Sequence, residues 1–155
     1  MEEKTILIVI PLKEKHRELL KKIAGKAEII FSDPERVAQE QVDQAEIILG
    51  NIPPEMVKKA KKLKWLQLNS AGFDAYAKAD IMGNRILTSC SGAYGQAVSE
   101  HMFAMLLAMQ KKLHFYRDDQ KLHKWGDEGM VTSISDTTVM VLGLGDIGKH
   151  FAWLA

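Results

Sequence analysis

The sequence has 155 residues, of which 46% are hydrophobic and 26% are charged, and its formal net charge is +1. This is the composition of a globular chain long enough for one domain and part of another, and so small a net charge gives no field that would attract nucleic acid or an anionic membrane. The single cysteine, Cys90, excludes an internal disulfide framework and suits a reducing compartment, so we expect a cytoplasmic protein. We also expect no nucleic-acid partner, no membrane partner and no metal site. The longest strongly apolar run, residues 102–109, is far too short for a bilayer span.

Short runs of β-forming apolar residues in the first half predict five strands, over residues 5–10, 27–31, 46–49, 65–68 and 85–88. Helices are predicted over 12–23 with Gly25 at its end, from the capping sequence 32–35, from Pro54, and over 74–79. Strands separated by helix-length segments imply right-handed crossovers and a mainly parallel sheet. This first domain is expected to close near residue 90.

A long helix is predicted next. From about residue 96 to about residue 121 neither proline nor glycine occurs, and apolar side chains recur at helical spacing. Between residues 97 and 109 the helix is apolar nearly all round, which calls for burial on more than one side. Such a helix usually crosses between domains or subunits, so we expect a homodimer formed through the 97–121 helix.

A glycine motif closes the sequence. The run 138–142 predicts a β-strand, and it leads directly into Gly143, Leu144, Gly145, Asp146, Ile147 and Gly148, with no helix breaker after them. Gly143 would permit the turn out of the strand, Gly145 would let the backbone approach a pyrophosphate, and Gly148 would let the helix pack closely on the strand. Free N–H groups at the helix N-terminus would face the phosphates. The alternative is a glycine-rich turn with no ligand.

Three segments in this order resemble a known family: residues 69–74 (NSAGFD), 92–101 (GAYGQAVSEH) and 141–148 (VLGLGDIG). Together they resemble the D-isomer-specific 2-hydroxyacid dehydrogenases, which include phosphoglycerate, glyoxylate/hydroxypyruvate and D-lactate dehydrogenases. The resemblance implies an α/β chain with a flavodoxin-like, parallel-sheet substrate domain over residues 1–95. It further implies that residues 96–155 form a linking helix, an arm and the first βα unit of a truncated Rossmann domain that binds NAD or NADP.

The resemblance also assigns a substrate site. In such enzymes, backbone N–H groups of the loop that matches Ser70, Ala71 and Gly72 hold the substrate carboxylate. The residues themselves agree, because a loop of small residues at the C-terminal end of a parallel strand leaves amides free to face an anion. The alternative is that Ala71 and Gly72 only form a turn.

The implied reaction is hydride transfer between a nicotinamide and a small 2-hydroxy or 2-oxo acid. The family's arginine, glutamate and histidine all lie beyond the glycine motif, so we expect no catalytic residue, an incomplete cofactor site and no activity from these 155 residues alone. The acidic residue that distinguishes NAD from NADP would lie about 20 residues past the motif, outside the sequence. The alternative function is a non-enzymatic interaction or regulatory module that dimerises through its long apolar helix. A kinase-like P-loop is excluded, because no Lys-Ser or Lys-Thr follows the glycines in register.

Overall fold

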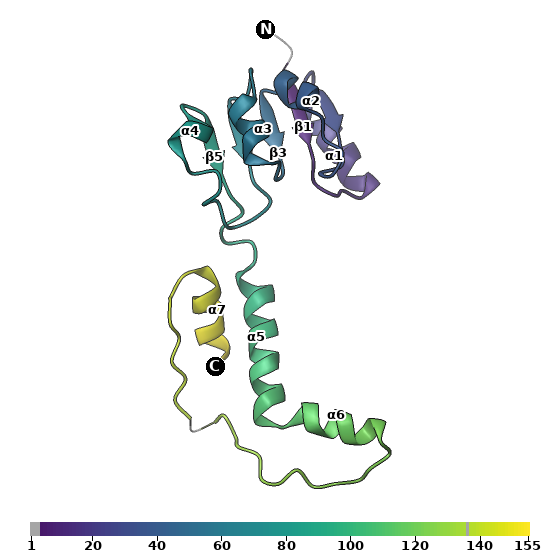
Figure 1. Cartoon of the computed structure of the whole chain (residues 1–155), viewed down its shortest axis with the longest axis vertical. Helices are drawn as coiled ribbons and strands as arrows, with labels where there is room; N and C mark the ends of the chain where they lie inside the picture. Colours follow the sequence, from purple (N-terminus) through teal and green to yellow (C-terminus); the bar gives the residue numbers. More distant parts are fainter. Residues whose placement is uncertain (1–3, 136) are drawn as a thin grey trace. The chain divides into compact units, whose positions relative to one another are not determined.

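The computed structural model describes residues 4–135 and 137–155, apart from the side chain of Ala79. The chain divides into two compact units, Met1–Ser91 and Gly92–Ala155, which are described separately (Figure 1). None of the helices in the described ranges is long and apolar enough to cross a membrane.

The first unit is built on a five-stranded parallel sheet with strand order β2-β1-β3-β4-β5. Its strands are β1 (Thr5–Ile8), β2 (Glu28–Phe31), β3 (Ile47–Leu49), β4 (Trp65–Gln67) and β5 (Ile86–Thr88). The helices between them are α1 (Glu14–Ala24), α2 (Gln39–Gln44), α3 (Pro54–Lys59) and α4 (Ala79–Met82). This is the flavodoxin-like order, so the α/β fold and the five predicted strands are confirmed.

The core of this unit lies at the centre of the sheet. Leu7 on β1 pairs with Ile48 on β3, which in turn pairs with Leu66 on β4, and all three side chains are fully buried. Each such residue contributes about 1.5–3 kcal/mol when it leaves water, so the apolar runs that predict the strands also hold the layers together. Gly25 ends α1 with a φ of 62°, as predicted.

Two of the predicted helix positions are wrong. The sequence 32–35 does not start a helix: the Asp33 side chain accepts a hydrogen bond from the Glu35 N–H at 2.9 Å and closes a single turn. Val37 then packs against the core, and the helix begins only at Gln39. The helix predicted over 74–79 is a turn, and the helix begins at Ala79, because buried Tyr76 is held to another loop.

The second unit consists of α5 (Gly95–Gln110), α6 (Leu113–Lys121), an irregular arm and α7 (Asp146–Leu154). The single predicted helix is therefore two helices. Lys112 separates them with a left-handed φ of 55°, and its ammonium group donates to the carbonyl oxygen of Glu128 in the arm. No glycine or proline marks this break, because a lysine takes the conformation that usually favours glycine.

The strand predicted over residues 138–142 is also wrong for this structure. In the described part of the second unit no strand is present, so the backbone groups of this segment have no ladder to join. Met140 and Leu142 are about nine-tenths exposed or more, at 90% and 98%. Gly143 therefore follows an unpaired segment, and the predicted exit from a β-strand is not observed.

Candidate functional site

The first candidate site lies where β3 and β4 end, at the same edge of the parallel sheet. Gly50 follows β3 with a φ of 118°, and a Cβ there would lie 2.6 Å from Cγ2 of Val9. Only glycine satisfies both constraints, so the chain turns sharply here. The turn places Asn51 beside the loop that follows β4.

Two asparagines join these loops. The Asn51 N–H donates to Oδ1 of Asn69 at 2.9 Å, and the Asn69 N–H donates to Oδ1 of Asn51 at 3.1 Å. The Asn51 side chain also donates from Nδ2 to Oγ of Ser70 at 3.0 Å. These bonds replace the strand ladder just where it stops, and they fix the start of the Ser70–Gly72 segment, here called the carboxylate loop.

The carboxylate loop is an exposed turn with free amides. Ser70 is half-buried, Ala71 and Gly72 are exposed, and the Ser70 hydroxyl donates to the carbonyl oxygen of Gly72 at 2.8 Å. The Ser70 carbonyl accepts from the Cys90 N–H at 2.9 Å, which anchors the loop to the segment after β5. Within the described ranges, nothing accepts a hydrogen bond from the N–H groups of the three loop residues. The loop can thus present amide dipoles to an anion.

Buried Tyr76 supports the carboxylate loop from its C-terminal side. Its hydroxyl donates to the carbonyl oxygen of Ile52 at 2.8 Å, so it ties the turn after the loop to the segment after β3. Burial raises the pKa of the Tyr76 phenol, and the group stays a neutral donor at physiological pH. The support is structural.

The second candidate site is the glycine motif at the start of α7. Gly145 caps the helix, and Gly143 precedes it with a φ of 94°. A Cβ on either glycine would meet nothing within 4 Å, so the backbone here is open to a close approach by a ligand. The first turn of α7 leaves its N–H groups without helical acceptors. This is the arrangement that a diphosphate requires.

Gly148 makes the turn possible. A Cβ at this position would lie 1.9 Å from the carbonyl oxygen of Gly143, a distance that no side chain tolerates. The open space around Gly145 fits the close approach of a ligand that is predicted for it. Gly143 does not leave a β-strand as predicted, and Gly148 packs against the loop rather than against a paired strand. The residues present fit a pyrophosphate group.

Asp146 carries a negative charge in the first turn of α7, where a diphosphate would be repelled. Its Oδ1 lies 3.5 Å from Nδ1 of His150, and a Cβ on Gly95 would meet that oxygen at 2.6 Å. The carboxylate is therefore turned toward the start of α5. Phe103 on α5 packs edge-to-face on Phe151, with ring centroids 6.2 Å apart, and this contact fixes α7 against α5.

The carboxylate loop belongs to the first unit and the glycine motif to the second. Sequence reasoning identified both, but it missed Gly50, Asn51 and Asn69. The sequence did carry a signal for the two asparagines. Asn69 directly follows a predicted strand, and Asn51 lies two residues beyond the end of another.

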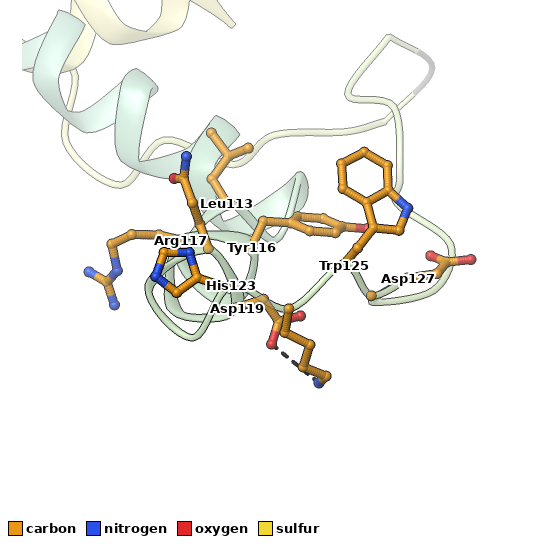
Figure 2. Close-up of a pocket in the computed structure, with 10 residues that line it drawn as sticks. Leu113, Tyr116, Arg117, Asp119, His123, Trp125 and Asp127 are labelled. Carbon is orange, nitrogen blue, oxygen red and sulfur yellow. Dashed lines mark hydrogen bonds and ion pairs between the residues drawn. The ribbon is translucent and has the colours of Figure 1, made fainter.

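A cavity of about 1010 Å³ lies between α6 and the arm (Figure 2). Tyr116, His123 and Trp125 line it, together with an ion pair of 3.2 Å between Asp119 and Lys124. It holds no nucleophile paired with a base. Over the described ranges, no group of three or more metal-binding side chains gathers anywhere.

The chain is similar to known proteins in sequence and in fold. Residues 103–155 match the family model of the D-isomer specific 2-hydroxyacid dehydrogenase NAD-binding domain. The chain is similar to the crystal structure of a D-isomer specific 2-hydroxyacid dehydrogenase family protein from Aeromonas salmonicida, with 29% identity and a TM-score of 0.80. That match covers 97% of this chain and 49% of the other.

Two further solved structures share the fold. D-lactate dehydrogenase from Aquifex aeolicus, complexed with NAD and lactic acid, is 21% identical, with a TM-score of 0.79 and coverage of 97% of this chain and 47% of the other. An acyclic imino acid reductase in complex with NADPH and D-Arg is 22% identical, with a TM-score of 0.78 and coverage of 97% and 52%. The chain spans about half the length of the solved structures that it matches.

Proposed function

Because this chain belongs to the D-isomer-specific 2-hydroxyacid dehydrogenase family, we propose that it supplies the N-terminal half of an NAD(P)-dependent dehydrogenase of 2-hydroxy acids. In this proposal residues 1–95 bind the substrate, and residues 96–155 form the linking helix, the arm and the start of the cofactor domain. The observation that carries the proposal is the open turn from Gly143 to Gly148 at the N-terminus of α7.

The carboxylate loop is proposed to hold the substrate. The N–H groups of Ser70, Ala71 and Gly72 are directed at no acceptor among the described residues, and the Asn51 side chain fixes Ser70 before any substrate arrives. A small 2-oxo or 2-hydroxy acid would be held by its carboxylate, since several amides together neutralise one anion. The loop orients the substrate and takes no part in proton transfer.

The glycine motif is proposed to hold NAD or NADP. The backbone of Gly143, Leu144 and Gly145 would lie along the pyrophosphate, and the N–H groups of Asp146, Ile147 and Gly148 would face its oxygens. When bound, the cofactor supplies the hydride that reduces the 2-oxo acid. The 155 residues contain no position that matches the family's catalytic arginine, glutamate or histidine, so we expect binding without turnover from this chain alone.

Nucleotide binding tests the cofactor site. NADH and NADPH are titrated into the 155-residue chain by calorimetry, with Gly145→Val as the variant and Met130→Ala, exposed in the arm, as the control. The open space around Gly145 lets the variant fold, and the new side chain should weaken binding at least about tenfold, since the backbone can no longer approach the phosphates. Equal affinity of the variant and the native chain would refute the cofactor site.

The carboxylate loop is tested in the same way. Oxamate serves as a stable analogue of a 2-oxo acid, and Ala71→Pro removes one loop N–H while Ala71→Ser keeps it. We expect Ala71→Pro, and not Ala71→Ser, to lose oxamate affinity. No consumption of NADH is expected with pyruvate, glyoxylate or hydroxypyruvate, and measurable turnover would show that catalytic groups lie within these 155 residues.

A homodimer through the 97–121 segment is proposed as well. Met102, Met105 and Met109 follow one another at helical spacing on α5, and their side chains are 44%, 55% and 68% exposed. An apolar stripe of this kind is typical of an interface. Sedimentation velocity should give a dimer for the native chain and a monomer for Met105→Lys; a native monomer would contradict the proposal.

A dimer without nucleotide binding would favour the second candidate, an interaction or regulatory module. A cytoplasmic location is proposed because Cys90 is a free thiol.

A further inference from the structure

A cavity of the first unit, about 540 Å³, opens where β1 and β2 end. It is here called the β1–β2 pocket. Its apolar wall comes from Ile10, Leu12 and Phe31, and its charged groups include Arg17 on α1 and Asp33 in the loop after β2. None of its lining residues belongs to the carboxylate loop. Small molecules commonly bind in pockets of this size at the carboxyl ends of parallel strands.

Arg17 is a half-buried cation that the described part of the chain leaves unpaired. Its Nε is shielded from solvent and has no hydrogen-bond partner there, and no described carboxylate forms an ion pair with it. Its Cζ lies 5.0 Å from the ring centroid of Phe31, which holds the guanidinium against the pocket wall. A buried donor without an acceptor is uncommon and unfavourable, so this geometry points to an acceptor supplied by a ligand.

Asp33 gives the pocket a negative charge. One carboxylate oxygen, Oδ1, accepts from the Glu35 N–H at 2.9 Å, and the other makes no hydrogen bond to any described residue. Glu35 also lines the pocket, and Nζ of Lys21 lies 5.8 Å from the centroid of the Phe31 ring. A simple anion would be repelled by the carboxylates of Asp33 and Glu35, and a simple amine would be repelled by the cations of Arg17 and Lys21. A molecule with one positive and one negative group can pair each group with a side chain of opposite charge.

We propose that the β1–β2 pocket binds a free α-amino acid with an apolar side chain. The ligand carboxylate would pair with the planar guanidinium of Arg17, which suits a two-pronged contact. The ligand ammonium group would pair with Asp33, and its side chain would pack on Ile10, Leu12 and Phe31. This binding does not depend on the proposed redox function, so either can fail while the other holds.

Titration of three related ligands tests the proposal. Leucine is added to the isotopically labelled 155-residue chain and followed by amide NMR, alongside isocaproate, which lacks the ammonium group, and isoamylamine, which lacks the carboxylate. Leucine should shift the amide signals of Ile10 and Phe31, and each analogue should bind at least about tenfold more weakly, since each loses one charge-assisted contact. No shift with leucine up to roughly 10 mM, or equal affinity for isocaproate, would overturn the proposal.

Variants assign the contacts. Arg17→Gln keeps much of the stem and removes the charge, Asp33→Asn removes the exposed carboxylate, and Arg36→Gln changes an exposed arginine outside the pocket. The first two should each weaken leucine binding at least about tenfold, with Arg36→Gln unchanged. Native affinity in folded Arg17→Gln would overturn the proposal. Asp33→Asn and the ligand series remain decisive if Arg17→Gln does not fold.

Discussion

The side-chain oxygens of Asn51 and Asn69 each accept a hydrogen bond from the other residue's backbone N–H, at 3.1 and 2.9 Å. The pair continues the β3–β4 ladder by one step after both strands have ended, with side chains in place of carbonyl groups. It therefore sets the distance between two loops that are far apart in sequence, and one of them is the carboxylate loop.

Asn51→Ala is expected to destabilise the first unit by about 1–3 kcal/mol, because the Asn69 N–H loses its acceptor in a partly buried place. Ser70 also loses the donor that fixes its hydroxyl. Urea denaturation followed by far-UV circular dichroism measures the change. Asn84→Ala, at an exposed asparagine, should stay within about 0.5 kcal/mol of the native chain, and equal stability of the two variants would contradict the assignment.

Gly148→Ala and Gly145→Ala form a matched pair on the second unit. The first places a Cβ 1.9 Å from a backbone oxygen, so the turn must distort, at about 1–3 kcal/mol. The second places a Cβ in open space at a φ of −73°, which alanine adopts freely. Thermal unfolding should show a lower melting temperature for Gly148→Ala alone. Two identical melting curves would mean that the turn is looser than the structure indicates.

Tyr76→Phe removes a buried hydroxyl and leaves the Ile52 carbonyl without its donor, which should lower stability by about 1 kcal/mol at neutral pH. The difference between the native chain and the variant should shrink as the pH rises. Burial raises the pKa of the native Tyr76 phenol above its ordinary value of 10.0. The stabilisation that the phenol contributes is therefore complete below pH 10.0 and is lost as the pH rises through the raised pKa. Urea midpoints of both proteins at several pH values above neutrality measure this, and a constant difference would refute the pKa direction.

Three lysine–carboxylate pairs predict a response to acid. Hydrogen bonds from Lys61, Lys64 and Lys58 lower the pKa of Asp43, Glu46 and Asp80, respectively. Because its pKa is lowered in the folded chain, each carboxylate contributes its full stabilisation when the pH is above the ordinary pKa, which is 3.8 for the aspartates and 4.5 for the glutamate. This stabilisation is lost as the pH falls below those values and passes through the lowered pKa. Melting temperatures measured from about pH 5 down to about pH 2 should therefore fall, and less steeply in Lys61→Gln. The pairs are exposed, so salt should reduce the difference between the variant and the native chain.

The sheet was predictable because its signal is local and strong. Runs such as residues 6–10 and 47–49 are apolar on both faces, as is typical of a buried parallel strand. Pro54 also starts its helix as predicted, because proline fits the first turn of a helix without losing a hydrogen bond. Residues 32–35 are similar helix-start residues, but Val37 packs against the core, so the chain leaves the helical path after one turn.

The carboxylate loop and the glycine motif were predictable because small residues directly after a strand or before a helix carry a backbone requirement that the sequence itself reveals. The positions of Asn51 and Asn69 near strand ends gave a signal for each residue separately. Their pairing was not predictable, since its bonds join residues 18 positions apart and depend on strand order. The break at Lys112 gave no signal either, because the amine that ties it to Glu128 reaches the arm only after folding. Residues 138–142 have the composition of a strand, but composition provides no neighbouring strand to pair with.

The place of β1 between β2 and β3 matters during synthesis of the protein. Once the first crossover has left the ribosome, β1 can pair with β2 on one side, but its other side keeps open N–H and C=O groups until Ile47–Leu49 follows. At translation rates of roughly 5–20 residues per second, that interval lasts on the order of a second. For that time the nascent chain presents an unpaired strand edge, which is a template for pairing with another chain.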